Sequence, residues 1–252
     1  MSEQKIALIT GGSRGLGKDM AIQIANKGID VIITYKTKEA EAKEVVNAIR
    51  STGRKAAALF LDMNAFNELD AFVAALKNTL TKEFNSETID CLINNAGMGA
   101  TVPFEKVDEL VFNEFMNVHY KSVFFLTQKI VPMMSSGSTI INISSSTTAY
   151  SVPGYSVYAS LKGAIEVFTK YLAFELGKKG IRANAVAPGP VETDFNNAAI
   201  RNNPDRKKYL GSLSPLNRVG QADDIGSVVA FLCTEESKWI NGQIIKVNGG
   251  LV

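Results

Sequence analysis

The sequence predicts an α/β protein built on a doubly wound parallel sheet with helices on both faces. Segments of strand character alternate with segments of helical character along all 252 residues. The strand segments are near-continuous Val and Ile runs rather than period-two alternations, as in parallel strands buried on both faces. No repeat, low-complexity segment or linker interrupts this pattern, so we expect residues 1–252 to form a single domain.

Three predicted strands, each followed by a predicted helix, make up the first part of the chain. The strands are apolar runs, the second rich in Val and Ile, at residues 5–10, 30–35 and 56–61. The helices place apolar residues at helical spacing and lie at residues 17–27, 37–51 and 64–84. Gly28 and Gly53 come just after the first two helices, where a glycine commonly ends a helix.

The rest of the chain continues the alternation. Further strands are predicted at residues 89–94, 138–143, 181–187 and 243–247. Helical segments are predicted at residues 107–134, 156–179 and 221–234. Because open α/β sheets bind ligands outside the carboxyl ends of their strands, the turns that follow these strands are the places to look for a site.

Composition excludes several function classes. A net charge of +2 with no basic block gives no electrostatic case for nucleic acid or a membrane surface. The chain enters its first strand without a signal peptide, and it has no apolar run of about 18 residues, so we expect a cytoplasmic protein. Cys91 and Cys233 are expected to be buried thiols. The single histidine, His119, is expected to be an ordinary helix residue, and no metal site is expected.

A glycine-rich turn joins the first strand to the first helix. Gly11, Gly15 and Gly17 follow the spacing G-x-x-x-G-x-G. Glycines there permit a tight turn, close approach to a pyrophosphate and close helix–strand packing, while the helix N-terminus attracts phosphate. This turn predicts a dinucleotide site; an ordinary turn without a ligand is the alternative.

Two more turns end at the same predicted edge. Asn94-Asn95-Ala96-Gly97 combines small residues with amides that can bridge neighbouring strands. The loop at residues 188–193 contains two prolines, which make it rigid, and Thr193, whose hydroxyl suits a carboxamide. Either segment taken alone is compatible with an ordinary loop, but together with the first turn they favour a nucleotide.

Tyr158 and Lys162 lie four residues apart in a predicted helix, which places both side chains on one face. A lysine ammonium near a phenol favours the phenolate, so we expect the pKa of Tyr158 to be lowered toward neutral pH, where it can exchange a proton. The strand at residues 138–143 ends at Ser144 and Ser145, and a hydroxyl there suits a carbonyl oxygen. The alternative is an ordinary helix beside a serine-rich turn.

Taken together, these motifs resemble the short-chain dehydrogenase/reductase family over essentially the whole chain, and within it the branch of 3-oxoacyl-[acyl-carrier-protein] reductases and related carbonyl reductases. The resemblance implies a single Rossmann-type domain with a seven-stranded sheet in the order 3-2-1-4-5-6-7, NAD or NADP as cofactor, and a tetramer. The motifs are Thr10-Gly11-x-x-x-Gly15-x-Gly17, Asn94-Asn95-Ala96-Gly97, Asn117, Ser145, Tyr158-x-x-x-Lys162 and Pro188-Gly189.

The resemblance also implies catalytic roles. Tyr158 is the general acid or base, Lys162 lowers its pKa and binds the nicotinamide ribose, and Ser145 orients the substrate oxygen. Asn117 bends its helix and holds a water of a proton relay. The implied cofactor contacts are Gly11, Gly12, Ser13, Arg14, Gly15, Leu16, Gly17, Tyr35, Lys36, Asp62, Met63, Asn95, Ala96, Gly97, Tyr158, Lys162, Pro188, Gly189, Val191 and Thr193.

Asp62 has two readings. By resemblance it contacts adenine, whereas from the bare sequence it is a helix cap near Asn64.

The second strand indicates which cofactor is preferred. Enzymes that use NAD usually end this strand with a carboxylate, which binds the ribose 2′-hydroxyl. Here the strand ends in Thr34 and Tyr35, followed by Lys36, and Asp30 lies at its other end. Arg14 and Lys36 can converge on a 2′-phosphate with no opposing anion, so NADPH is predicted over NADH. The alternative is that both cations are merely solvated.

The sequence leaves several alternatives open for the substrate and for the class of protein, and it predicts an oligomer. Residues 194–215 resemble a mobile substrate lid, whose basic run at residues 206–208 is expected to be a solvated face. A carrier-linked thioester is an alternative substrate, for which Lys178, Lys179 and Arg182 could dock the carrier. A catalytically silent nucleotide sensor and a methyltransferase-type fold are alternatives of other classes. Apolar side chains on helices 107–134 and 156–179 predict a homotetramer: Phe112, Phe115, Phe124, Phe125, Phe168, Tyr171 and Phe174.

Overall fold

A computed structural model describes residues 4–252, and it contains the predicted parallel sheet. Seven strands pair in the order β3-β2-β1-β4-β5-β6-β7, and every pairing is parallel. The predicted fold and strand order are therefore confirmed. The strands are β1 (Ile6–Ile9), β2 (Asp30–Tyr35), β3 (Ala56–Phe60), β4 (Cys91–Asn94), β5 (Thr139–Ile143), β6 (Arg182–Pro188) and β7 (Ile244–Val247).

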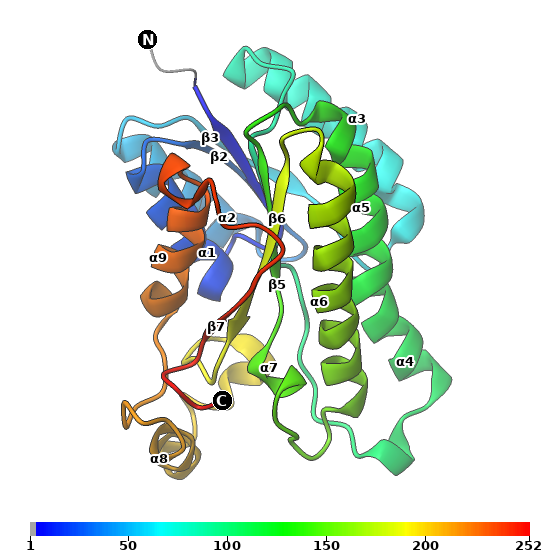
Figure 1. Ribbon diagram of the computed structural model, residues 1–252, viewed down its shortest axis with the longest axis vertical. Helices are drawn as coiled ribbons and strands as arrows, with labels where there is room; N and C mark the ends of the chain where they lie inside the picture. The colour runs from blue at the N-terminus through cyan, green and yellow to red at the C-terminus, as the bar shows by residue number, and fades with distance from the viewer. Residues whose placement is uncertain (1–3) are drawn as a thin grey trace.

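Two layers of helices cover the sheet (Figure 1). One layer is formed by α1 (Gly15–Asn26), α2 (Glu39–Ser51) and α9 (Ala222–Leu232). The other is formed by α3 (Leu69–Thr79), α4 (Glu109–Met116), α5 (Ser122–Ile130) and α6 (Ser156–Gly177). Along β1 the side chains of Ile6 and Leu8 join the core under α3, α5 and α6, whereas Ala7 and Ile9 join the core under α1, α2 and α9. Both strand faces are buried, which explains the unbroken apolar runs.

Several helices differ in detail from the sequence-based prediction. The predicted helix at 64–84 is divided into a 3₁₀ turn, η1 (Phe66–Glu68), then α3, then a π turn, η2 (Leu80–Phe84). The helical region at 107–134 is divided by a π turn, η4 (Asn117–Lys121), and ends in η5 (Val131–Met133). Three further 3₁₀ turns are η3 (Phe104–Lys106), η6 (Ser146–Thr148) and η7 (Glu235–Ser237). Hydrophobic spacing cannot distinguish these tighter or wider turns from a continuous α-helix.

A chain of buried side-chain hydrogen bonds crosses the middle of the sheet. Asn94 of β4 lies opposite Asn142 of β5, and its Nδ2 donates to Asn142 Oδ1 (2.8 Å) and to Thr127 Oγ1 (3.0 Å). Asn142 Nδ2 in turn donates to Thr169 Oγ1 of α6 (2.9 Å). The predicted bridging of neighbouring strands by an asparagine amide is thus present, and it ties β4 and β5 to α5 and α6.

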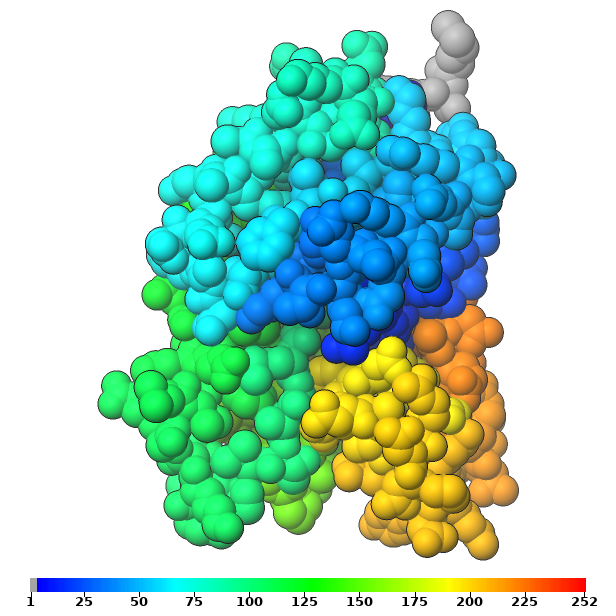
Figure 2. Space-filling model, turned by 180° about the vertical axis from the view of Figure 1, so that it is seen from behind, coloured from blue at the N-terminus to red at the C-terminus, as the bar shows by residue number. Residues whose placement is uncertain are grey.

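The segment at 194–215 lies beyond the carboxyl ends of the strands. It contains the short helix α7 (Phe195–Ala198) and α8 (Pro204–Ser212). In Figure 2 this segment, in yellow, and the green segment that follows β4 stand on either side of a hollow below the blue N-terminal part. The predicted site edge and the predicted lid therefore face each other.

Candidate active site

A cavity of about 500 Å³ opens at the carboxyl ends of the strands, within the size range of about 300–1,000 Å³ typical of small-molecule sites. Its walls are the turns after β1, β2, β4, β5 and β6, the start of α6, and the lid. The predicted residues that line it are Gly11, Ser13, Arg14, Gly15, Leu16, Gly17, Tyr35, Lys36, Asp62, Met63, Asn95, Ala96, Gly97, Ser145, Tyr158, Lys162, Pro188, Gly189, Val191 and Thr193.

Two predicted residues lie outside this lining. The backbone N–H of Gly12 donates to Thr34 O (2.9 Å), and a Cβ at Gly12 would lie 2.6 Å from Ile33 Cβ. Gly12 therefore serves the close packing of the turn on β2. Asn117 begins the π turn η4, and its Nδ2 donates to Asn64 Oδ1 (3.1 Å). The helix is interrupted at Asn117, as the resemblance implies, but this side chain is not part of the cavity wall.

The glycine-rich turn has the geometry of a phosphate-binding site. Gly11 and Gly15 have φ of +69° and +55°, and a Cβ at Gly17 would lie 2.1 Å from Gly11 O. Only glycine fits these three positions without distortion. At the start of α1, Arg14 makes no side-chain cap and the first turn contains no acidic residue. The N-terminal N–H groups and the positive end of the helix dipole are thus left for an anion, so the residues present fit a dinucleotide.

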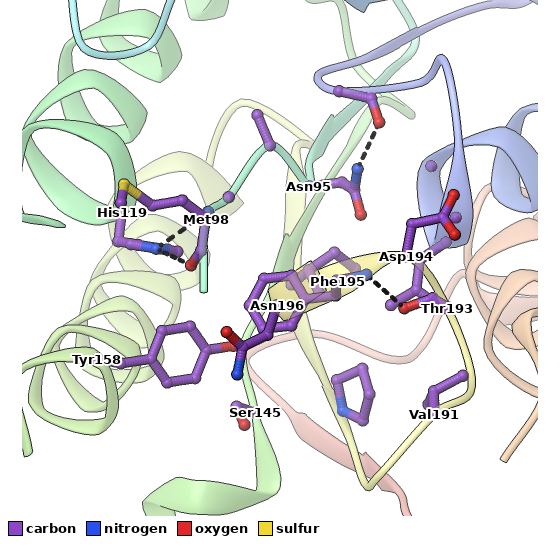
Figure 3. Close-up of a pocket in the computed structure, with 18 of the residues that line it drawn as sticks. Asn95, Met98, His119, Ser145, Tyr158, Val191, Thr193, Asp194, Phe195 and Asn196 are labelled. Atoms are coloured by element: carbon purple, nitrogen blue, oxygen red, sulfur yellow. Dashed lines mark hydrogen bonds between the residues drawn. The ribbon is translucent and has the colours of Figure 1, made fainter. Parts of the chain in front are cut away.

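Asn95 joins this turn to the end of β4. Its Nδ2 donates to Thr10 O (2.8 Å) and Gly11 O (3.0 Å), while Thr10 Oγ1 accepts from the backbone N–H groups of Asn95 and Ala96. Figure 3 shows the Asn95 amide directed at the glycine-rich turn. These hydrogen bonds therefore fix the glycine-rich turn against the turn that follows β4, and both turns are walls of the cavity.

The structure separates the three serines after β5. Ser144 Oγ donates to Glu166 Oε1 (2.7 Å), and Ser146 Oγ donates to Ala187 O (3.3 Å), so both are turned to neighbouring elements. Ser145 Oγ accepts from Thr147 N and Oγ1 (3.2 and 2.9 Å), and its hydroxyl acts to lower the pKa of Tyr158. In Figure 3 the Tyr158 ring points into the cavity with Ser145 near its hydroxyl end.

Tyr158 and Lys162 are both buried on one face of α6. Lys162 Nζ lies 5.6 Å from the centroid of the Tyr158 ring and donates to Ile143 O (2.7 Å). Burial lowers the pKa of Lys162 to about 8. Burial also raises the pKa of Tyr158, against a smaller opposing effect of the neighbouring Ser145 hydroxyl. The predicted lowering of this pKa is therefore wrong for the protein alone, because desolvation of the phenolate dominates and the ammonium is directed at a carbonyl.

The predicted 2′-phosphate site also needs correction. Arg14 is exposed at the mouth of the cavity, but Lys36 Nζ forms an ion pair with Asp62 Oδ2 (2.9 Å). An anion is therefore present beside Lys36, contrary to the expectation of two unopposed cations. Asp62 Oδ1 accepts from Asn64 N (2.8 Å), which is the local capping contact read as the alternative role of Asp62.

The predicted lid contacts the cavity wall through two residues, Phe195 at Tyr158 and Asn196 at Tyr155. The Phe195 ring centroid lies 6.1 Å from that of Tyr158, and Gly99 makes room for it, since a Cβ there would lie 2.6 Å from Phe195 Cε1. Asn196 Nδ2 donates to Tyr155 OH (3.1 Å). Residues 196–198 have left-handed φ of 52°, 56° and 55°, which costs a non-glycine residue roughly 1–2 kcal/mol each.

The site contains a residue whose role the sequence did not reveal. His119 was expected to be an ordinary helix residue, yet its ring is buried, lines the cavity and meets the Tyr158 ring edge-on at 5.2 Å between centroids. Its position two residues after Asn117 is the only local signal. Its hydrogen-bond partner, Met98, is 21 residues away in the chain, so sequence reasoning could not pair them.

The proposed carrier-docking residues lie away from the cavity. Tyr158 is near the first turn of α6, whereas Lys178 and Lys179 follow its last residue, Gly177, at the opposite edge of the sheet. Arg182 begins β6 and donates to Leu232 O and Ile240 O (both 3.0 Å). The suggestion that these three cations dock a carrier at the site entrance is therefore wrong.

No helix among residues 4–252 combines the length and apolarity needed to cross a membrane. No group of three or more His, Cys, Asp or Glu side chains in the same range could hold a metal ion.

Fold and site together define a doubly wound α/β protein whose cavity fits a dinucleotide. Residues 11–252 match the family model described as enoyl-(acyl carrier protein) reductase. The hydroxynaphthalene reductase-like protein Arp2 of Metarhizium robertsii is 36% identical over 98% of this chain and 95% of its own length. Hydroxynaphthalene reductase arp2 of Aspergillus fumigatus is 34% identical over 95% and 89%. The chain belongs to the short-chain dehydrogenase/reductase family, which confirms the resemblance seen in the motifs.

Solved structures agree. The promiscuous reductase LugOII, which catalyses keto-reduction at C1 during lugdunomycin biosynthesis, is 34% identical, covers 98% of this chain and 97% of its own, and superposes with a TM-score of 0.93. The angucycline C-6 ketoreductase LanV with bound NADP is 32% identical, covers 98% and 95%, and has a TM-score of 0.93.

Proposed function

We propose that this protein is an NADPH-dependent ketoreductase that converts a carbonyl to a secondary alcohol. Ser145, Tyr158 and Lys162 meeting at one wall of a dinucleotide-sized cavity is the observation that supports this most directly. The cofactor is supported by neighbours whose structures are described with NADP or NADPH. When bound, NADPH would supply the hydride.

The chain's own residues supply the proton and the orientation. Tyr158, kept protonated by burial, donates its hydroxyl proton to the carbonyl oxygen as the alcohol forms. Ser145, which lines the cavity near the hydroxyl end of Tyr158, orients that oxygen. Lys162 supports the developing phenolate with its positive charge and offers its ammonium to the nicotinamide ribose. The glycine-rich turn would hold the pyrophosphate, and Asn95, Ala96, Gly97, Val191 and Thr193 form the opposite walls.

A fused-ring ketone is the substrate class that the cavity suits best. The part of the cavity beyond Tyr158 is lined by apolar and aromatic side chains from the wall and the lid: Met98, Tyr150, Val152, Tyr155, Phe195, Ile200 and Leu210. Flat aromatic molecules pack well on such rings. Relatives described as acting on hydroxynaphthalenes and angucyclines support the same class.

A carrier-linked 3-oxoacyl or enoyl thioester is the second candidate. The description of the matching family model favours it. It would need a cationic docking surface near the entrance, where Arg206 lines the cavity and Lys207 is paired with Glu192 (2.6 Å).

A substrate panel tests the proposal. Loss of NADPH absorbance would be followed with fused-ring ketones, simple ketones, sugars and acetoacetyl thioesters. We expect turnover with the fused-ring ketones at the highest kcat/KM. Preference for acetoacetyl thioesters would support the second candidate. No turnover with any of them, together with tight NADPH binding, would instead support a nucleotide sensor, and binding of S-adenosylmethionine would support the methyltransferase-type alternative.

Cofactor choice gives a prediction at Arg14. We expect a higher kcat/KM with NADPH than with NADH, and Arg14→Ala should raise the KM for NADPH by about 10- to 100-fold, since a hydrogen bond to a charged group contributes roughly 1.5–3 kcal/mol. The KM for NADH should change little. Lys36→Ala is the matched comparison and should have a smaller effect, because Asp62 already neutralises Lys36. A wild-type kcat/KM for NADH equal to that for NADPH would contradict the proposal.

Assembly is also a proposal. Of the side chains expected at an interface, Phe115 and Phe168 are buried and Phe124 and Phe125 are half-buried, so they belong to the core of this chain. Apolar side chains do remain exposed on α4 and α6: Leu110 (81%), Phe112 (42%), Val167 (54%), Tyr171 (62%) and Phe174 (85%). We infer a homotetramer with two-fold interfaces on these helices.

The cytoplasmic location of the protein stays a prediction.

Light scattering tests this assembly. We expect the mass of a tetramer at micromolar concentration, and Phe174→Glu should lower it, because a carboxylate cannot be buried without a partner. A monomeric wild-type protein would overturn the inference.

A further inference from the structure

The imidazole of His119 lies between the turn that follows β4 and Tyr158, the proposed proton donor. It lies in the π turn η4. Gly97 leaves room for it, since a Cβ there would lie 3.0 Å from His119 Cε1. Its ring stacks on Phe115 (centroids 5.6 Å apart, planes at 27°) and meets the Tyr158 ring edge-on (5.2 Å, 89°). One side chain therefore touches both the wall after β4 and the ring that bears the reacting hydroxyl.

A hydrogen bond fixes the orientation of this ring. His119 Nε2 lies 2.8 Å from Met98 O and 3.3 Å from Met98 N. One ring nitrogen cannot donate and accept at once, and the shorter contact assigns the proton to Nε2, donating to the carbonyl. Nδ1 then bears the lone pair, and it is buried without a hydrogen-bond partner among residues 4–252.

The ring remains neutral in this environment. Burial, followed by the positive charge of Lys162, lowers the pKa of His119 to about 3, against a smaller raising effect of the Met98 hydrogen bond. Other titratable groups line the same cavity around Tyr158: Glu114, Tyr150, Tyr155 and Lys162. A neutral imidazole does not donate a proton to substrate near neutral pH, so its contribution is to position other groups.

We propose that His119 is a positioning residue for the proposed ketone reduction: tied to Met98, its ring clamps the Tyr158 ring and fixes where the Tyr158 hydroxyl meets the carbonyl oxygen. This rests on the proposed function. A tyrosine ring bounded by His119, Tyr155 and Phe195 has little freedom to tilt. Without the clamp on one side, the hydroxyl samples positions from which proton transfer is slow.

Two substitutions of similar size distinguish the effect of the hydrogen bond to Met98 from the effect of side-chain packing alone. His119→Gln keeps an N–H donor that can reach Met98 O, whereas His119→Leu removes it. We expect His119→Leu to lower kcat by about 10- to 100-fold with the KM for NADPH nearly unchanged, because misplacement of a catalytic group by about 1 Å can cost that much. His119→Gln should recover a substantial part of the loss. The solvent isotope effect on kcat should rise in His119→Leu, since proton transfer becomes slower than hydride transfer.

A purely structural role would lower the melting temperature of both variants without moving the isotope effect. Equal kcat in the two variants, or kcat within about twofold of wild type in His119→Leu, would overturn the proposal. If His119→Leu does not fold, Phe115→Leu removes the ring stacked under the imidazole, and unchanged kcat and isotope effect there would overturn it equally. Failure of the wild-type protein to reduce any ketone would count against the proposed function instead.

Discussion

Tyr158→Phe is expected to lower kcat for ketone reduction by about 10²- to 10⁴-fold, the range that general acid–base catalysis typically contributes. The substitution removes the transferable proton and keeps the ring. The contacts of that ring with His119, Tyr155 and Phe195 should therefore survive. Steady-state kinetics with a saturating fused-ring ketone would measure the loss, and quenching of protein fluorescence by NADPH should show cofactor affinity close to that of wild type.

Tyr155→Phe is the matched control for this experiment. It removes a hydroxyl from a neighbouring tyrosine of the same cavity, whose oxygen accepts from Asn196 Nδ2. We expect it to change kcat far less than Tyr158→Phe does. If Tyr158→Phe retained more than about a tenth of the wild-type kcat, Tyr158 would not be the proton donor.

Lys162→Ala is expected to have the second largest effect, and a different one. It should lower kcat by about 10²-fold or more, because the phenolate of Tyr158 loses its neighbouring charge. It should also raise the KM for NADPH by roughly 10- to 100-fold, since charged hydrogen bonds contribute about 1.5–3 kcal/mol. Lys170→Ala, at an exposed lysine of the same helix, is the control and should leave both parameters unchanged.

A pH profile gives an independent check on Lys162. Burial lowers its pKa to about 8, and the cationic form exists below the pKa. Wild-type kcat should therefore be constant at neutral pH and fall as pH rises through about 8. That alkaline decline should be absent in Lys162→Ala. An identical decline in both proteins, or an unchanged KM for NADPH in the variant, would contradict the proposed role.

Much of the fold and of the cavity wall could be predicted because both follow from local patterns. Apolar runs locate the strands, and parallel strands end at one edge, so the turns after Thr10, Asn94 and Ala187 had to meet there. Gly17 is an example of a residue that predicts local geometry. Its position tolerates no Cβ because Gly11 O is too close, so the glycine itself indicates a tight turn. The choice of Ser145 among three serines needed the family spacing, since hydroxyl directions are set by partners such as Glu166 and Ala187.

What the sequence could not predict depends on contacts between distant segments and on burial. The rise in the Tyr158 pKa is a desolvation effect, which the four-residue spacing to Lys162 does not report. The Lys36–Asp62 ion pair joins the turns after two strands. Residue type alone allowed Lys178 and Lys179 as docking cations, but the length of α6 carries them to the far edge of the sheet.

The two asparagines that face each other on β4 and β5 help to fix the register of these two strands. Strands that are apolar on both faces contain little information about register, because sliding one past its neighbour still buries apolar side chains. Here any slip would separate Asn94 from Asn142 and leave their amides without these partners in the core. Each unsatisfied buried group costs roughly 1–3 kcal/mol. Two amides in a largely apolar pair of strands thus penalise every misaligned pairing, and with it every misplacement of the turns that form the cavity.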